Sequence, residues 1–429
     1  MPDSRLILRI ISLYVLLLAT RSLLMGQDLD QTYYRDIQPI IYQNCVQCHQ
    51  PGQSGPFSLL TYEDLANRSN MIQYVIKNRY MPPWYADPTY QNYLNERGLT
   101  DKEIESIVDW IKSGKVAGIP VDTLEIPDGL IPNKSPDLRV EMNNVYQIPA
   151  KGIDDFRFFH MPTNIEEDKY LQAIEFIPGN SRYVHHSRIM ADTTNNIEGI
   201  DGLSEMDPSV YDFQKVPLAD DFLYGWVPGN FPLFFPDGVG KKLYANTDLV
   251  LNIHYAPSSS IQSDRSAIQL YFSKKKVKRE VQTMILREND IVNQPFFLPA
   301  DQKPTFFIQS DTIESDISLI SVMPHMHYLG KSFESYAVTL ASDTIPLIRI
   351  PKWDFNWQTM YQFEGYLKIP AGSVIYAIAA YDNTVNNPLN QYFPPRNVTY
   401  GWRTVDEMMN LVFYYLDYKK GDEKVKFEK

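Results

Sequence analysis

Five of the seven histidines in this sequence fall into three tight groups along the chain. The groups are His185 with His186, His254 within Asn-Ile-His-Tyr, and His325 with His327. On a strand, side chains two residues apart project from the same face, so His325 and His327 can bind one metal ion together. Adjacent residues normally point to opposite faces, so His185 and His186 can share a metal only where the strand is bulged or ends.

The residue types missing from these groups restrict the metal. Both cysteines of the chain belong to a different motif, so neither a thiolate copper centre nor a cysteine zinc site can form here. No aspartate or glutamate lies within the groups, which disfavours a binuclear zinc hydrolase or an iron facial triad. Imidazoles with an available methionine thioether suit copper. The isolated His160 is instead expected to be a hydrogen-bonded structural residue.

A second motif, Cys45-Val46-Gln47-Cys48-His49, is typical of a covalent c-type haem. Each thiol can add to one vinyl group of the haem, and the adjacent histidine can ligate the iron. A redox dithiol or half of a zinc site is the alternative, but the chain has no second cysteine pair to complete a zinc site. We therefore expect a haem bound through Cys45, Cys48 and His49.

The haem iron needs a sixth ligand, and a methionine thioether is common where the haem carries electrons. Met81 is the candidate, because Pro82 and Pro83 keep the chain out of a helix and can present the side chain from a stiff loop. Met71 is the competing residue. It lies in a helix-like stretch over 62–79, where we expect it to pack in the core.

Helical signals surround the haem motif. Thr100 and Glu103 form a capping box, after which apolar residues recur at helical spacing. An earlier helix is expected over Asp36–Tyr42, with its first residue as N-cap. Together with the Met-Pro-Pro-Trp segment at 81–84, these features resemble the small c-type cytochrome domains of the MPPW type. The resemblance implies an all-α cytochrome domain over residues 27–118.

Beyond about residue 119 the pattern changes to short apolar or alternating runs separated by proline, glycine and asparagine, which is typical of all-β structure. The clearest runs are 138–142, 170–177, 247–255, 267–272, 336–340 and 374–381. A basic segment at 274–279 has the composition of a solvated connection, so two β domains are expected, at 119–275 and 276–429. A charged hairpin inside a single domain is the alternative.

The length of 429 residues leaves room for several domains, at roughly 100–200 residues each. The net charge of −12 argues against nucleic acid as a partner, because binding nucleic acid needs a basic face. Residues 1–26 carry Arg5 and Arg9 before a short apolar run, which is typical of a signal peptide. We expect export to the periplasm or the extracellular space, with an uncleaved anchor at a membrane surface as the alternative.

Four segments in chain order resemble the copper type II, ascorbate-dependent monooxygenases, the family of peptidylglycine alpha-hydroxylating monooxygenase and dopamine beta-monooxygenase. The segments are Val184–His186, Leu251–Tyr255, Pro324–Lys331 and Asp406–Asn410. The resemblance covers about residues 120–420. It implies two jelly-roll-like β-sandwiches, each with one copper ion, that face each other across a solvent-filled cleft.

The resemblance also implies a role for each candidate ligand. The copper ion that stores and passes an electron would be held by His185, His186 and His254. The catalytic copper ion would be held by His325, His327 and Met408. A weak thioether ligand favours Cu(I), which is the state that binds dioxygen. The neighbouring Met409 is the rival ligand.

Two positions depart from the peptide-amidating members of this family. In those members an arginine and a tyrosine hold the substrate carboxylate, whereas this chain has Met323 and Val412 in the corresponding places, although Asn410 is kept. The substrate is therefore not expected to be a glycine-extended peptide. The segment Trp353–Trp357 also resembles a family segment, and we assign it a structural role.

These features predict an exported haem- and copper-dependent monooxygenase that hydroxylates a C–H bond of a small-molecule or peptide-like substrate with O2. The electrons would come from an ascorbate-like reductant or a redox protein and pass through the covalent haem to a two-copper site. Tethering raises the effective concentration of the donor near the acceptor. A non-catalytic haem and copper electron-transfer or copper-binding protein is the alternative. A structural β-sandwich protein with zinc, or with no metal besides haem, is another.

Overall fold

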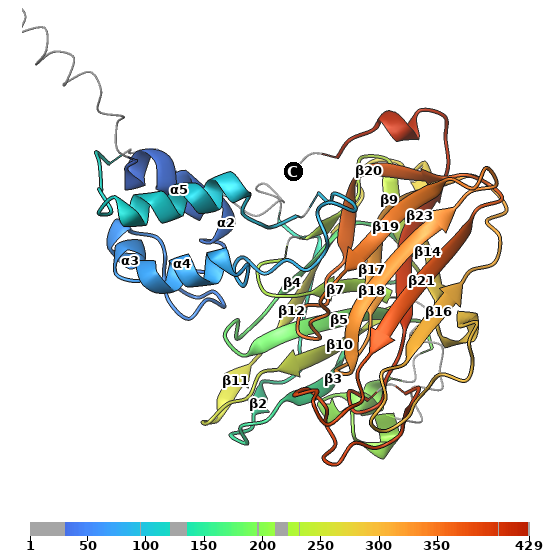
Figure 1. Ribbon diagram of the computed structural model, residues 1–429. Helices are drawn as coiled ribbons and strands as arrows, with labels where there is room; N and C mark the ends of the chain where they lie inside the picture. Colours follow the sequence, from blue (N-terminus) through green and yellow to red (C-terminus); the bar gives the residue numbers. More distant parts are fainter. Residues whose placement is uncertain are drawn as a thin grey trace, which may run out of the picture. The chain divides into compact units, whose positions relative to one another are not determined.

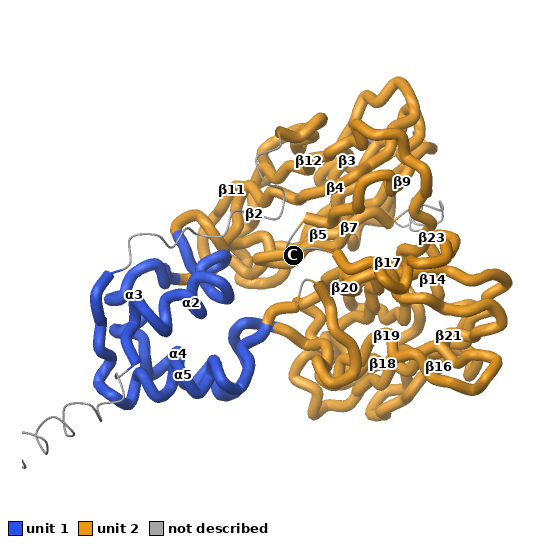
Figure 2. The backbone as a smooth tube through the Cα atoms, turned by 90° about the horizontal axis from the view of Figure 1, so that it is seen from above, with its two compact units in different colours: residues 1–50, 57–83, 98–127 blue, residues 51–56, 84–97, 128–429 orange. Residues whose placement is uncertain are grey.

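The computed structural model describes residues 31–94, 96–120, 135–194, 197–210, 222–230, 232–401 and 403–427. The expected signal peptide, residues 1–26, lies outside these ranges. The described chain forms two compact units (Figure 2): a helical unit of residues 31–50, 57–83 and 98–120, and a β unit of residues 51–56, 84–97 and the chain from 135 onward. None of the described helices is both long and apolar enough to cross a membrane.

Short helices packed around one apolar core build the helical unit (Figure 1). They are the π-helix η1 at Tyr33–Ile37 and the α-helices α2 Gln38–Asn44, α3 Tyr62–Ala66, α4 Ser69–Lys77 and α5 Asp101–Lys112. The core is formed by Tyr33, Ile37, Ile41, Leu65, Ile72, Ile76, Ile107 and Trp110, among others. In α4 and α5 the buried residues recur at helical spacing, so one face of each helix packs inward.

Local hydrogen bonds set where these helices begin. The capping box of α5 is confirmed, because the Thr100 hydroxyl accepts from the Glu103 N–H and the Glu103 carboxylate accepts from the Thr100 N–H. The expected start at Asp36 is wrong. The helix begins at Tyr33, with Thr32 as N-cap, and the Asp36 carboxylate accepts from the Thr32 N–H one turn earlier.

The segment Trp84–Arg97, which follows the Met-Pro-Pro sequence, packs with the strands. Tyr93 pairs with Phe363 in an isolated antiparallel bridge, and its buried hydroxyl donates to the Leu347 carbonyl at 2.7 Å. The Trp84 ring lies edge-on to Tyr361, with ring centroids 5.1 Å apart. The segment that starts at Trp84 therefore belongs to the β unit, whereas Met81, Pro82 and Pro83 belong to the helical unit.

The first β region consists of two main sheets around a shared core (Figure 1). One sheet has the order β1 (Leu138–Glu141), β12 (Ala267–Phe272), β4 (Lys169–Ile177), β9 (Val239–Leu243), β13 (Arg279–Glu280), with β8 (Leu233–Phe234) on β4. The other has the order β6 (Leu203–Ser204), β3 (Asp155–Met161), β10 (Asp248–Tyr255), β5 (Val184–Asp192), β7 (Phe222–Trp226). A small sheet pairs β2 (Tyr146–Ile148) with β11 (Gln262–Asp264). Because β13 pairs with β9, the first region extends to Glu280.

The second β region also has two main sheets, of four strands each, around its own apolar core. One sheet has the order β14 (Gln282–Leu286), β23 (Asn410–Asp417), β17 (Ile317–His325), β20 (Tyr361–Ile369). The other has the order β16 (Thr305–Gln309), β21 (Val374–Tyr381), β18 (Gly330–Val338), β19 (Thr344–Ile350), and β15 (Phe297–Leu298) pairs with β22 (Val398–Thr399). The all-β prediction for this part of the chain is confirmed, and β12 and β21 occupy the predicted residues.

The two β regions share an apolar interface. Met323 of β17 and Val412 of β23 belong to the core cluster of the first region. The buried hydroxyl of Tyr414, also on β23, donates to the carbonyls of Phe222 and Leu223 at 2.6 and 2.8 Å. The sheet that carries β5 and β10 is therefore held directly against the sheet that carries β17 and β23.

We expect Tyr414→Phe to weaken this interface. The substitution removes one hydroxyl that donates to two buried carbonyls, so the free energy of unfolding should fall by about 1–3 kcal/mol in urea denaturation. Tyr415→Phe is the matched control, because the Tyr415 hydroxyl donates to Gln282 at an exposed position. Equal losses in the two variants would contradict the importance of the Tyr414 contact.

Candidate metal centres

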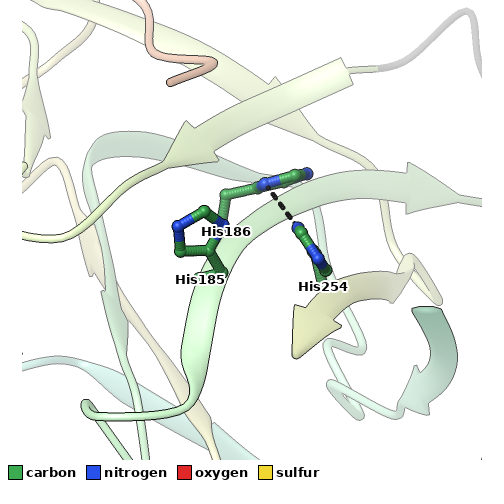
Figure 3. Close-up of side chains that lie close together, drawn as sticks. All are labelled: His185, His186 and His254. Atoms are coloured by element: carbon green, nitrogen blue, oxygen red, sulfur yellow. Dashed lines mark hydrogen bonds between the residues drawn. The ribbon is translucent and has the colours of Figure 1, made fainter. Parts of the chain in front are cut away.

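A bulge in β5 brings the first histidine group together. In the antiparallel pair of β5 and β10, His186 lies opposite His254 but Val184 lies opposite Tyr255. His185 is therefore the extra residue, so of the two expected arrangements, a bulge or a strand end, the structure shows a bulge. One ring nitrogen from each of His185, His186 and His254 lies within 4.8 Å of the others (Figure 3). Within the described ranges, this is the one group of three histidine, cysteine or carboxylate side chains positioned to hold a metal ion.

The hydrogen bonds of this group leave nitrogen lone pairs for a metal. The Nε2 atom of His254 lies 2.7 Å from the Asp154 carboxylate, so Nε2 carries the proton and Nδ1 carries the lone pair. That Nδ1 atom lies 3.2 Å from Nδ1 of His186. The Nδ1 atom of His185 is buried and finds no hydrogen-bond partner among the described residues. A metal ion bound by the three rings would satisfy these atoms, so the residues fit such an ion.

Burial keeps these imidazoles in the neutral form that binds metals. Desolvation lowers the pKa of His185 to about 4 and also lowers the pKa of His186 and of His254. Burial is the largest influence on Asp154 and acts to raise its pKa, but the interactions with His254, His185 and Tyr328 together outweigh burial and lower the pKa. The ring of Phe156 stacks on His254 with centroids 4.1 Å apart, which fixes the plane of that imidazole.

The second histidine pair lies at the end of β17. His325 is the last residue of that strand and lies opposite Asn410 of β23. The Nδ1 atom of His325 donates to the side-chain oxygen of Gln358, and the Nδ1 atom of His327 donates to the Asp406 carbonyl at 3.0 Å. Both rings therefore keep the lone pair on Nε2. The two ring centroids are 5.1 Å apart.

One buried carboxylate links this pair to the methionine segment. Glu407 accepts from the backbone N–H groups of His327 at 3.0 Å, Leu329 at 2.7 Å and Met408 at 3.2 Å. Burial raises the pKa of Glu407 to about 8, although the three N–H donors act in the opposite direction. Glu407 thus holds the backbone of one candidate histidine ligand and of the candidate methionine ligand at the same time.

The structure distinguishes the two adjacent methionines. Both are fully buried, but Met409 belongs to the apolar core of the second β region. Met408 is absent from the core clusters of the described chain, and its sulfur lies 3.4 Å from the amide nitrogen of Asn410, the residue opposite His325. This placement favours Met408 over Met409 as the third ligand beside His325 and His327.

A buried aromatic ring lies between the two histidine groups. The ring centroid of Phe355 is 5.5 Å from His186, 6.1 Å from His254 and 6.0 Å from His327. Phe355 is almost inaccessible to solvent and packs with Phe156 and Tyr328 in a small apolar cluster. The family resemblance implies a solvent-filled cleft between two metal sites, whereas here an apolar ring occupies the space that the two groups share.

A cavity opens beside His325 at the interface of the two β regions. It is lined by Arg188, Met190, Phe222, Ile285, Arg287, Met323, His325, Tyr400, Asn410 and Val412. Met323 and Val412, the two positions that depart from the peptide-amidating enzymes, both face this cavity. Most of its wall is apolar, so it suits a ligand with an apolar body.

The haem motif lies in the helical unit. Cys45 and Cys48 are half-buried, and Nδ1 of His49 donates to the Phe57 carbonyl at 3.0 Å, which leaves Nε2 with the lone pair that an axial ligand needs. The side chain of Met81 is 43% exposed and that of Met71 is 44% exposed. The expectation that Met71 packs in the core is wrong, because α4 buries Ser69, Ile72 and Ile76.

The isolated His160 behaves as expected. It is buried on β3, and its Nε2 atom lies 2.8 Å from the carboxylate of Asp248 on the neighbouring strand β10. It lies outside both histidine groups. The interpretation of His160 as a hydrogen-bonded structural residue is confirmed.

Sequence patterns did not identify the residues that orient the candidate ligands. Asp154 precedes β3, Gln358 lies before β20, and both are far in sequence from the histidines that they contact. Glu407 was part of a matched segment, but nothing in its spacing indicated three hydrogen bonds from other backbone groups. Phe355 could have been noticed as the centre of an aromatic segment, although its position between two histidine groups depends on the tertiary fold.

Replacing Asp154 by asparagine should weaken metal binding at His185, His186 and His254. The change removes the carboxylate that fixes the tautomer of His254, and the loss of such a partner typically costs 10- to 100-fold in metal affinity. Competition titration with a chelator of known affinity measures the change. Asp248→Asn is the matched control, since it alters the same kind of carboxylate–histidine pair at His160. An unchanged affinity in Asp154→Asn would contradict the proposed orientation of His254.

No model of a known protein family matches the chain, and no curated protein matches it. The solved structures that resemble it include a VP2 subviral particle of infectious bursal disease virus, at 9% identity over 67% of this chain and 73% of that chain, with a TM-score of 0.17. Another is allantoicase, at 10% identity over 53% of this chain and 77% of that chain, with a TM-score of 0.16. At these scores neither likeness carries an argument, so a function has to be inferred from the geometry of the site itself.

Proposed function

We propose that this chain is a copper-dependent monooxygenase that hydroxylates a C–H bond with O2 and receives its electrons through a covalent c-type haem. The observation that carries the proposal is the arrangement of two histidine groups in one β unit. In the first group one ring nitrogen of each histidine lies close to the others, and in the second group both rings carry the lone pair on Nε2. The resemblance of the same segments to copper type II, ascorbate-dependent monooxygenases supports this assignment.

The two proposed sets of copper ligands differ in chemical softness. His185, His186 and His254 offer imidazoles alone, whereas His325 and His327 would be completed by the thioether of Met408. Copper would supply one-electron transfer at the all-imidazole site and dioxygen activation at the thioether site, because a thioether favours Cu(I). The two sets therefore suit an electron store and a catalytic centre.

The surrounding residues would prepare both sites before any metal binds. Asp154 holds the His254 proton on Nε2, and Gln358 holds the His325 proton on Nδ1. Glu407 fixes the backbone positions of His327 and Met408. Phe355 excludes water from the space beside the rings, which strengthens electrostatic interactions there and limits side reactions with water.

The haem half of the proposal rests on the Cys45–His49 motif and on the segment that follows Met81. Tyr85 lies in that segment, and its hydroxyl donates to the carboxylate of Asp354 at 2.7 Å. Asp354 is adjacent to Phe355, the ring between the two histidine groups. One hydrogen bond thus joins the segment that follows Met81 in the sequence to the residue next to Phe355.

Met408→Ile should abolish substrate-dependent oxygen uptake while leaving the haem content intact, because the third ligand of the catalytic copper is lost. Copper per chain should fall from two ions towards one in elemental analysis. Met409→Ile is the matched control, because Met409 packs in the core and should tolerate a change to another apolar side chain with little effect on copper. Unchanged oxygen uptake in Met408→Ile would refute the assignment of this ligand.

The metal content of the wild-type chain separates the proposal from its alternatives. Two copper ions and one haem per chain, with oxygen uptake in the presence of a substrate, are expected for the monooxygenase. Two copper ions without any oxygen uptake would indicate a non-catalytic electron-transfer or copper-binding protein. Zinc, or no metal besides haem, would indicate a structural β protein.

Stopped-flow spectroscopy should show the haem acting as an electron donor. When the haem is reduced anaerobically and then mixed with oxygen, the reduced haem band should decay faster in copper-loaded protein than in copper-free protein. His254→Ala, which removes one ligand of the first site, should slow the decay to the copper-free rate. A haem that stays reduced in the copper-loaded chain would contradict the relay.

A further inference from the structure

Arg188 is a charged residue that the proposed function does not yet use. It lies on β5, two residues after His186, and borders the cavity beside His325. Its Nε and Nη2 atoms donate to the side-chain oxygen of Asn252 at 3.2 and 2.9 Å. Its Nη1 atom lies 3.3 Å from Nε2 of His325, the nitrogen that carries a lone pair. Arg188 therefore reaches from the first histidine strand to the second histidine group.

The charge of Arg188 has no direct counter-ion in the described chain. Its hydrogen-bond partners are the neutral Asn252 and His325, and no carboxylate of the described residues lies within ion-pair distance. Glu205 acts on it only through space, and the Glu205 carboxylate accepts hydrogen bonds from Thr404. An arginine stays protonated at physiological pH, and a desolvated cation costs free energy unless it is paired. This position is suited to an anion supplied by a ligand.

The cavity next to Arg188 indicates the rest of that ligand. Its apolar wall is formed by Met190, Phe222, Ile285, Met323 and Val412. Its polar lining is formed by Arg188, Arg287, Tyr400, Asn410 and His325. A molecule that fits both parts has an apolar body and one anionic group. The planar guanidinium matches the geometry of a carboxylate, and one arginine neutralises a single negative charge.

We propose that this cavity is a binding site for an amphipathic carboxylate, whose carboxylate pairs with Arg188 and whose apolar body lies against Met190, Phe222 and Val412. The assignment of this ligand as the substrate rests on the proposed monooxygenase function. Because the Nη1 atom of Arg188 lies next to His325, a carboxylate held there would bring the adjoining carbon atoms to the second histidine group. Arg188 would then be a binding residue that selects acids over neutral molecules.

The contact between Arg188 and His325 couples carboxylate binding to metal binding. In this structure the Nε2 lone pair of His325 accepts from Nη1 of Arg188. The same lone pair would be needed to ligate a metal ion, and Nη1 would then lose its acceptor. A carboxylate can replace that acceptor, so metal loading and carboxylate binding should favour each other.

Isothermal titration calorimetry on the full chain tests the site without relying on turnover. The probes are two matched pairs, 4-phenylbutanoate with 4-phenylbutanamide and octanoate with octanamide, added to copper-loaded protein. We expect at least one acid to bind roughly 10- to 100-fold more tightly than its amide, the range given by one charge-assisted hydrogen bond. The acid should also bind more tightly to copper-loaded protein than to metal-free protein.

Arg188→Gln should remove the preference for the acid, and Arg188→Lys should retain part of it. Arg139→Gln is the matched control, because it deletes the same charge from a residue that is outside the cavity and paired with Glu141. This control should keep the full preference. Copper content and circular dichroism report whether each variant is folded, and the comparison of acid with amide on the wild-type chain needs no variant.

Equal affinities for acid and amide, absence of binding for both acids, or a preference that survives in Arg188→Gln would each overturn the proposed site. Oxygen uptake, measured in parallel, keeps the two proposals apart. Acid-selective binding without oxygen uptake would support the carboxylate site and count against the monooxygenase. Oxygen uptake with a neutral substrate, in a chain that binds neither acid, would support the monooxygenase and overturn the carboxylate site.

Discussion

The apolar interface between the two β regions is the constraint on which the rest of the β unit depends. Two contacts hold one sheet of the first region against one sheet of the second. The Tyr414 hydroxyl donates to two carbonyls of β7, and Met323 and Val412 are buried in the core of the first region. One sheet carries the bulge at His185, and the other ends at His325. Because the hydrogen bonds between strands make each sheet rigid, the packing of the two sheets also sets the distance between the two histidine groups. The cavity lies at the same interface.

The hydrogen-bond acceptors that contact the ring nitrogens determine which nitrogen of each histidine can bind a metal ion. An imidazole that uses one nitrogen as a donor presents the other as a ligand, so Asp154, Gln358 and the Asp406 carbonyl each select a tautomer. The two groups differ in which nitrogen carries the lone pair: it is Nδ1 on His254 and Nε2 on His325 and His327. The same hydrogen bonds hold the rings in place, so little reorganisation should be needed for a metal to bind.

The sequence was sufficient for the features that depend on local patterns. The capping box of α5, the strands β12 and β21, the bulge at His185 and the structural role of His160 follow from spacing and local chemistry. The sequence was insufficient where partners come from distant strands, as with Asp154 and Glu407, because periodicity carries no information about which loops meet. It also misplaced Met71, since one residue of helical phase separates a buried position from an exposed one.

Phe355 and Arg188 favour different degrees of hydration at the interface between the two β regions. An apolar ring between two groups of imidazoles favours a dry, closely packed boundary, whereas a guanidinium without a counter-ion is destabilised by the same dryness. Both can be accommodated if the boundary is closed at Phe355 and open at the cavity, where a ligand can reach Arg188. Under the proposed function, this division would keep water from the space between the metal sites while leaving Arg188 available to the substrate.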